Sequence, residues 1–328
     1  MAIHAGREAL AIADRLSLDD VRSHALNSVG MARFYLGDPD GIADLERSVE
    51  IALAAGSHLA SISYNNLAAM HRCAGDVRRD QELREEGLRL AERFGDGRTV
   101  RFLRGALIEH AYFGGRWHDA LREADRFVAE CEAGSPHYLE ANAHWIRALL
   151  RLARDEGERA AADALRADEL AREAKDPQSL LPALGIHLRV ELELGRLERA
   201  AALSAELLRK HPNVAPLPPA IELAWTAERL ETADAVREWI EAIVVQSAWN
   251  DAALAILDGE LEKAADLFAK IGSLPDEARA RLRAAERLVA AGRRAEADVQ
   301  LQQALAFYRS VGATRHIREG EALLAAAS

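Results

Sequence analysis

The sequence predicts an all-α protein, a right-handed solenoid of about eight stacked helix hairpins. The first observation is a period of forty residues, because Gly75, Gly115, Asp155 and Gly195 follow one another at that spacing. Each lies in a short turn between two apolar-periodic segments. The second observation is composition, since the apolar residues are mostly Ala and Leu, which favour helix, and no alternating strand pattern of useful length is present. A fixed period of this length is typical of helical-repeat arrays.

A small residue recurs in the second helix of each pair. Ala120, Ala160 and Ala200 each lie five residues past a turn, and Ala264 and Ala297 take the same place later in the chain. We expect the two helices of a pair to approach closely at this position.

The first segment, residues 3–16, resembles the second helix of a pair that has no first helix before it. Either the chain begins part-way through an array, as a fragment of a longer protein, or this segment is a short N-terminal cap. Helix pairs are then expected to turn at residues 37–40, 74–76, 114–116, 154–157 and 195–196. Gly, Pro and Asp at these turns are the usual helix breakers.

Residues 212–219 hold four prolines in eight residues, which disfavours helix and favours an extended segment. We place the only domain boundary there. The predicted organisation is a first array over residues 1–211, a proline-rich hinge over 212–219, and shorter repeats over 220–328. The later helices are expected at 220–230, 232–246, 247–258, 260–271, 275–291 and 294–311, with a final capping helix at 315–326.

Charge and cysteine content exclude several classes of protein. The formal charge of -11 argues against nucleic-acid binding by this segment. Two cysteines are too few for a disulfide framework, which favours a reducing compartment. The N-terminus has no signal-peptide pattern and no run is long enough to cross a membrane, so a cytoplasmic protein is expected.

No motif for catalysis, metal or cofactor binding stands out. Residues 94–99 form a Gly-containing stretch without the lysine of a phosphate loop, and residues 38–41 lack the pattern of a calcium loop. His137 and His144 lie seven residues apart and His110 and His118 straddle a turn, but no pair has zinc spacing. We therefore expect a protein that is not an enzyme and that binds no metal or cofactor.

These features resemble the tetratricopeptide repeat (TPR) family. A small residue lies seven places before the turn, Gly-Asp or Gly-Arg forms the turn, and alanine follows five places later. The small residues are Gly30, Ala68, Ala148 and Ala285. The resemblance departs from the family in its period, which exceeds the usual thirty-four residues, and at Asp80 and Ile108.

The resemblance implies that the first helix of each pair lines a concave groove with exposed side chains. Distance from the turn then selects candidate groove residues that would bind a protein or peptide: Asn27, Asn65, Arg72, Glu109, Tyr112, Asn142, Trp145 and Arg189. Asn amides pair with an extended peptide backbone, aromatic side chains supply contact area, and Arg binds carboxylates. For Asn27, Asn65 and Arg72 a purely structural role is equally open, and Phe34, Phe113 and Met31 are expected in the core.

Residues 301–326 are similar to the C-terminal end of large bacterial signalling ATPases, which often carry a cyclase or a DNA-binding domain. This implies a non-enzymatic effector- or partner-binding arm of a signalling ATPase, cyclase or transcription regulator. The alternative is a stand-alone receptor for a short peptide. A third reading, a helical-toroid enzyme, needs several carboxylates in the groove, and the register supplies mainly Glu109.

Overall fold

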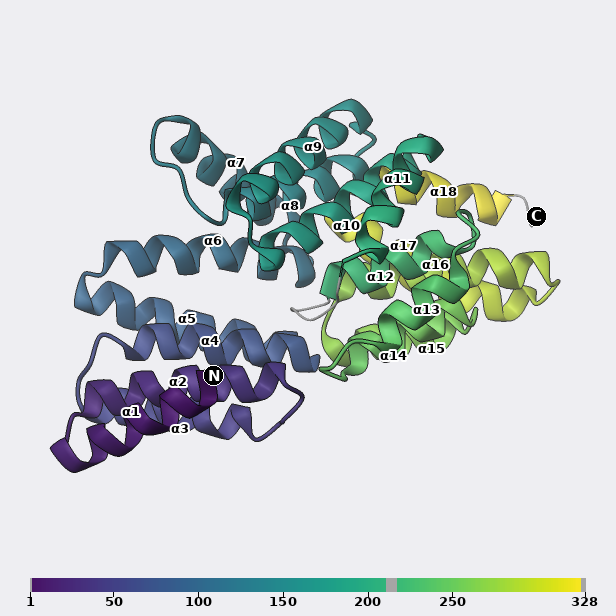
Figure 1. Cartoon of the computed structure of the whole chain (residues 1–328). Coiled ribbons are helices and arrows are strands. Elements are labelled where there is room, and N and C mark those ends of the chain that lie inside the picture. Colours follow the sequence, from purple (N-terminus) through teal and green to yellow (C-terminus); the bar gives the residue numbers. More distant parts are fainter. Residues whose placement is uncertain (1, 211–216, 326–328) are drawn as a thin grey trace. The chain divides into compact units, whose positions relative to one another are not determined.

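The computed structural model describes residues 2–210 and 217–325, and every regular element within them is an α-helix (Figure 1). Contacts divide the chain into two compact units. Unit 1 contains Met1–Leu107 and Val244–Ser247, and unit 2 contains Ile108–Ile243 and Ala248–Ser328. The chain passes from one unit to the other within α6.

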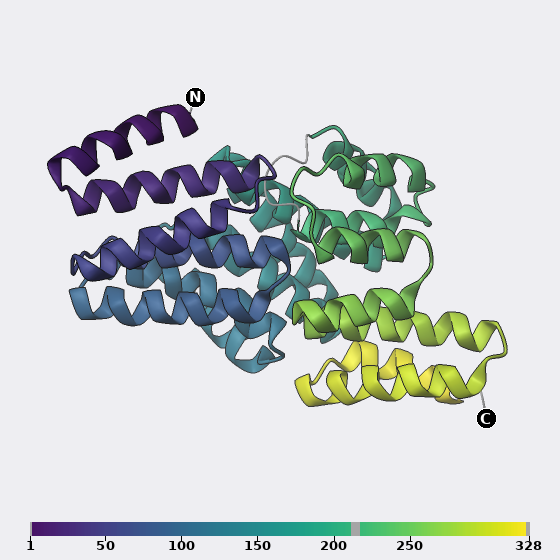
Figure 2. The same cartoon turned by 90° about the horizontal axis from the view of Figure 1, so that it is seen from below.

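Unit 1 is built from the first helices of the chain, which Figure 2 shows in layers that follow chain order. They are α1 (Ala2–Leu16), α2 (Asp19–Tyr35), α3 (Gly41–Ala54), α4 (Ala60–Ala74), α5 (Val77–Phe94) and the first part of α6 (Gly97–Phe113).

Unit 2 holds the end of α6 and the twelve helices that follow it in the described chain. They are α7 (Trp117–Glu132), α8 (Glu140–Ala153), α9 (Gly157–Ala174), α10 (Pro177–Glu193), α11 (Leu197–Leu208), α12 (Leu217–Ala227), α13 (Ala233–Glu241), α14 (Ala248–Leu257), α15 (Leu261–Ile271), α16 (Leu274–Ala290), α17 (Arg294–Val311) and α18 (Thr314–Ala325).

The predicted pairing of consecutive helices is confirmed. Between α1 and α18 the described helices follow as eight consecutive pairs, α2–α3 to α16–α17. Within pairs, α2 packs on α3, α4 on α5, α8 on α9 and α16 on α17, while α3 packs on α4, α9 on α10 and α15 on α16 to join neighbouring pairs.

The four residues of the forty-residue period all adopt the left-handed conformation that ends a helix. Their φ angles are 95° at Gly75, 72° at Gly115, 63° at Asp155 and 76° at Gly195. Glycine takes this conformation without steric cost, and Asp tolerates it better than most residues with a side chain. The turn predicted at Asp155 without a glycine is therefore confirmed.

The small-residue positions are buried where helices cross. Ala120, Ala160 and Ala200 are 0% exposed. Asp80 departs from the alanine pattern but is also 0% exposed, because the Arg84 Nε lies 2.7 Å from one of its carboxylate oxygens. A charged residue thus occupies the close-packed position only with an ion-pair partner beside it.

The predicted hinge falls largely outside the described residues, because residues 211–216 are not among them. Helix α12 begins at Leu217, three residues earlier than expected, so Pro219 lies in its first turn, where a missing backbone N–H costs no intrahelical bond. The hinge and the domain division at 212–219 remain predictions. Helix α13 ends at Glu241, earlier than the expected residue 246.

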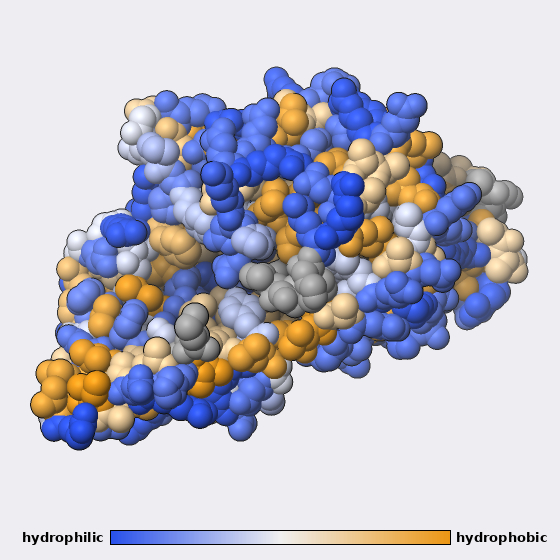
Figure 3. Space-filling model, viewed as in Figure 1, coloured by the Kyte–Doolittle hydropathy of each residue, from blue (hydrophilic) through white to orange (hydrophobic). Residues whose placement is uncertain are grey.

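Exposed apolar side chains gather where α1 turns into α2. Ile12, Leu16, Leu18 and Val21 are between 42% and 62% exposed, and orange surface marks this end of unit 1 at the lower left of Figure 3. Ile12 and Leu16 belong to α1, so the first helix carries exposed apolar side chains.

In unit 2 the last helix, α18, lies against a helix from one of the first pairs of that unit. Helix α18 packs on α17, α16 and α8, although α8 lies far earlier in the sequence.

Candidate ligand site on the inner face of unit 2

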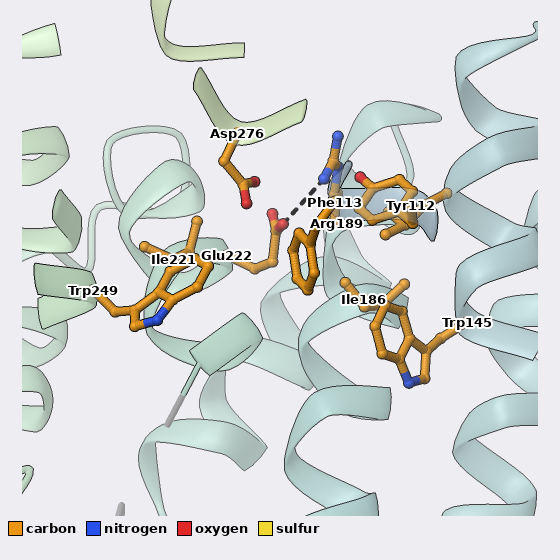
Figure 4. Close-up of a pocket in the computed structure, with 10 residues that line it drawn as sticks. Tyr112, Phe113, Trp145, Ile186, Arg189, Ile221, Glu222, Trp249 and Asp276 are labelled. Atoms are coloured by element: carbon orange, nitrogen blue, oxygen red, sulfur yellow. Dashed lines mark hydrogen bonds and ion pairs between the residues drawn. The ribbon is translucent and has the colours of Figure 1, made fainter. Parts of the chain in front are cut away.

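A cavity of about 30 Å³ lies in unit 2 and is lined only by the first helices of successive pairs. Figure 4 shows side chains from α6, α8, α10, α12, α14 and α16 converging on it. The lining residues are Tyr112, Phe113, Trp145, Leu149, Ile186, Arg189, Ile221, Glu222, Trp249 and Asp276. The expectation that first helices form the inner face is therefore met in unit 2.

Aromatic side chains form much of the cavity wall, and their neighbours fix their positions. The Tyr112 ring stacks on Trp117 at 5.5 Å between centroids, and the Trp117 Nε1 donates to the Tyr112 carbonyl at 3.0 Å. Phe113 lies against Trp249 with 6.1 Å between ring centroids. Trp145 is 2% exposed, and its buried indole N–H has no hydrogen-bond partner among the described residues.

The rest of the cavity wall is polar and ionic. Glu222 accepts from the Arg189 Nη1 at 3.2 Å and from the Arg279 Nη1 at 2.7 Å, one guanidinium at each carboxylate oxygen. Asp276 accepts from the Ser273 Oγ at 2.5 Å, and burial raises the pKa of the Asp276 carboxyl. In Figure 4 the Asp276 and Glu222 carboxyls point toward one another.

This wall is one end of an ion-pair chain that crosses unit 2. From Arg279 the chain continues to Glu193 at 3.7 Å, and from Glu193 to Arg315 on α18 at 3.1 Å. It then passes to Glu319 at 3.4 Å. Glu319 lies 2.9 Å from Arg283, which pairs with Glu286 at the surface.

The ion-pair chain therefore alternates four arginines with four glutamates: Arg189, Glu222, Arg279, Glu193, Arg315, Glu319, Arg283 and Glu286. It joins α10, α12, α16 and α18. Burial opposes ionisation of Glu193, but Arg279 and Arg189 hold the pKa of its carboxyl below the usual range. Glu193 is thus ionised at neutral pH.

Three of the eight predicted groove residues meet at the cavity: Tyr112, Trp145 and Arg189. Glu109 is buried one helical turn before Tyr112, and Asn142 is half-buried one turn before Trp145. The predicted exposure is wrong, since none of the eight is exposed. In unit 2, Tyr112 is stacked on Trp117 and Arg189 is paired with Glu222.

Asn27, Asn65 and Arg72 lie in unit 1, where neighbouring side chains hold them. The Asn66 Nδ2 donates to Asn27 at 3.2 Å, and the Asn65 Nδ2 donates to Asn66 at 3.2 Å. The Arg84 Nη1 donates to the Asn65 Oδ1 at 2.5 Å, and Arg72 lies 3.8 Å from Asp80. These contacts support the structural role that the sequence left open, and ligand binding by these residues remains a prediction.

Several lining residues were missed from the sequence. Phe113 was assigned to the core, and it is indeed buried at 7% exposure, but it also lines the cavity. Glu222, Trp249 and Asp276 lie after the proline-rich segment, where the repeats shorten and the forty-residue register no longer locates a position. The signal that would have found them is their place in the first helix of each later pair.

The inner face carries more carboxylates than the spacing of the turns predicted. Glu193, Glu222 and Asp276 lie there in addition to Glu109. Glu193 and Glu222 are paired with arginines, as described above. Among residues 2–210 and 217–325, no three His, Cys, Asp or Glu side chains are placed to hold a metal ion. Within the same ranges, no helix has both the length and the apolar run that crossing a bilayer requires.

The sequence stretches weighed as other motifs have structural roles. Asp96, in residues 94–99, caps α6 by accepting from the Thr99 backbone N–H at 3.1 Å. Asp38 pairs with the Arg33 Nε at 2.7 Å. The His144 Nδ1 lies 2.9 Å from Asp163, so this histidine belongs to a buried ion-pair cluster.

No protein-family model matches the chain. A comparison with curated proteins likewise finds no match. Solved structures do match. NprR in complex with its cognate peptide NprX is 14% identical, with a TM-score of 0.61 over 82% of this chain and 81% of that one.

Two further solved structures are similar. The apo form of the quorum sensor NprR from B. thuringiensis is 14% identical, with a TM-score of 0.51 over 93% of this chain and 82% of that one. A Rap protein complexed with Competence and Sporulation Factor is 11% identical, with a TM-score of 0.52 over 95% and 86%. At these identities the likeness shows the fold, and it confirms the predicted fold class: the chain is an all-α, TPR-like helical-repeat solenoid.

Proposed function

We propose that this chain is a non-catalytic receptor that binds a short peptide on the inner face of unit 2. The observation that carries the proposal is the cavity, to which six successive first helices each contribute side chains. The aromatic side chains and ion-paired groups that line it are the surface types that anchor peptide side chains. The likeness to a peptide-bound solenoid supports the same reading.

The proposal includes regulation. A ligand that binds between first helices of several pairs makes contacts that depend on how those pairs are stacked. Such a ligand shifts the population of stacking states by its difference in affinity for them. The peptide would thus change the surface that unit 2 offers to a protein partner, which is how a regulatory module of this kind would act.

Panning a phage-displayed library of random short peptides on the full chain tests the proposal. The decisive variant is Ile221→Phe, which fills the cavity with a larger side chain in place of a residue that is 3% exposed. Enriched peptides, remade synthetically, should bind the wild-type chain and lose at least about tenfold in affinity in Ile221→Phe, or about 1.4 kcal/mol.

The matched control is Ile62→Phe, the same substitution at a residue of α4 that is 39% exposed. It should leave binding unchanged. The proposal fails if no sequence is enriched, or if Ile221→Phe binds the peptides as tightly as the control while melting at the same temperature.

The resemblance of the C-terminal residues to bacterial signalling ATPases supports a second proposal, in which this receptor is the regulatory arm of such an ATPase. Residues 301–326 carry that resemblance, and α17 and α18 form there. Sequencing the gene upstream of the Met1 codon tests it. A reading frame that continues into a Gly-rich loop ending in Lys-Ser or Lys-Thr supports the arm, whereas an in-frame stop codon refutes it and leaves the stand-alone receptor.

A further inference from the structure

Arg189 and Arg279 both donate to Glu222 at the cavity wall, whereas the hydrogen bond to Asp276 comes from Ser273. The ion-pair chain has equal numbers of arginines and glutamates, so its formal charges cancel. Asp276 stands outside that chain, and its hydrogen bond comes from Ser273, an uncharged donor. His316, beside Glu319, adds no balancing charge at neutral pH because burial lowers its pKa.

The surroundings of Asp276 suit a positive charge. Asp276 and Glu222 face the same space in Figure 4. Tyr112, Phe113 and Trp249 line the same space, and aromatic faces attract cations that are shielded from water. Both partners of a buried cation, a carboxylate and an aromatic wall, are thus present around one cavity.

The size of the cavity restricts which cation fits. A volume of about 30 Å³ is room for about two waters. An ammonium group with its attached carbon has this size, whereas a guanidinium or a quaternary ammonium group is larger. We therefore expect this space to favour a small cation over a larger one.

We propose that this cavity is a subsite for a primary ammonium group, bound by Asp276 beside Phe113 and Trp249. The inference deepens the proposed function and rests on it for the identity of the ligand, since a peptide supplies such a group at its amino terminus or at a lysine side chain. The subsite itself is testable without any peptide.

Thermal unfolding of the full chain with methylammonium chloride tests the subsite directly. At about 0.2 M the salt should raise the melting temperature of the wild-type chain by about 1–2 °C over equal sodium chloride. Asp276→Asn, which keeps the shape of the side chain and removes its charge, should abolish the rise. Tetramethylammonium chloride should give no rise in either chain.

Glu286→Gln is the matched control, because it removes a carboxylate at the surface end of the ion-pair chain, away from the cavity. It should keep the methylammonium effect. No rise in the wild-type chain, or an equal rise in Asp276→Asn, overturns the inference.

Three pools of random short peptides then distinguish the sources of the ammonium group. The first has free amino termini and no lysine, the second has acetylated termini and includes lysine, and the third has acetylated termini without lysine. Retention of the first or second pool on the immobilised chain, read by mass spectrometry, identifies the source.

Equal retention of the third pool contradicts the requirement for an ammonium group. Retention of no pool, together with stabilisation by methylammonium, refutes the proposed peptide function and leaves the ammonium subsite standing. Failure of the proposed peptide function and failure of the ammonium subsite thus give different results.

Discussion

Arg318 and Asp155, 163 residues apart in sequence, form a two-point ion pair in unit 2. The Arg318 Nη1 lies 2.6 Å from Asp155 Oδ2, and the Nη2 lies 3.0 Å from Oδ1. The pair joins α18 to the turn between α8 and α9. Asp155 thus ends one helix of its own pair and also holds the last helix of the unit.

A double-mutant cycle on this pair should show favourable coupling. Arg318→Ala, Asp155→Asn and the double variant should give a coupling energy of about 0.5–1 kcal/mol in urea unfolding, because the contact is bidentate but Arg318 is 70% exposed. Asn retains the tolerance for the left-handed turn. The single-contact pair Arg309–Glu321 is the control and should give a smaller coupling energy. Equal coupling energies in both cycles would show that the second contact of the Arg318–Asp155 pair adds no stability.

The crossing of α2 and α3 should not tolerate a methyl group. A Cβ at Gly41 would lie 2.4 Å from the Gly30 carbonyl oxygen and 2.7 Å from the Phe34 backbone nitrogen. Gly41→Ala should therefore lower the free energy of unfolding by about 1–3 kcal/mol despite the higher helix propensity of Ala. Gly97→Ala is the control, since nothing lies within 4 Å of a Cβ there. An equal urea midpoint for Gly41→Ala and Gly97→Ala would contradict the close crossing.

Asp163 should be the more important of two acids that bind the same arginines. It is 3% exposed, and it lies 2.5 Å from both Arg147 and Arg151. Asp163→Asn leaves these cations without their buried partner, so we expect a loss of about 2–4 kcal/mol. Asp125→Asn removes a half-exposed partner of the same arginines and should cost under about 1 kcal/mol. Chemical denaturation of both variants measures the two losses in free energy of unfolding. Similar losses would mean that burial of the acid does not determine the strength of its ion pairs.

The helices, turns and close-packed alanines were predictable from sequence because they depend on local signals. The left-handed turn at Asp155 and the buried Ala160 follow from spacing within one repeat. Such positions are determined by helix periodicity and capping, which act over a few residues.

The cavity was only partly predictable, because it depends on the stacking of many pairs. Arg189 was found by counting back from Gly195, but its partner Glu222 lies beyond the proline-rich segment, where counting fails. Arg315 reaches Glu193 only because α18 returns to the inner face. Contacts that span more than a hundred residues leave no periodic trace in the sequence.

Acid should weaken the docking of α18 through Glu319. Burial opposes ionisation of this carboxyl, but the hydrogen bond with His316 and the charge of Arg283 lower its pKa to about 2. A glutamate in the unfolded chain has a pKa of about 4.3. The stabilisation from Glu319 is therefore present above that pH and is lost as the pH falls toward 2.

The wild-type chain should therefore lose about 1–2 kcal/mol more than Glu319→Gln between roughly pH 4.5 and 2, after discounting for solvent screening. Amide hydrogen exchange of α18 at each pH measures this, with faster exchange expected first in the wild-type chain. Glu296→Gln is the control, because that carboxylate also has a lowered pKa but lies on the exposed face of α17. Parallel pH profiles for wild type and Glu319→Gln would mean that Arg315 and the Arg318–Asp155 pair hold α18 without help from Glu319.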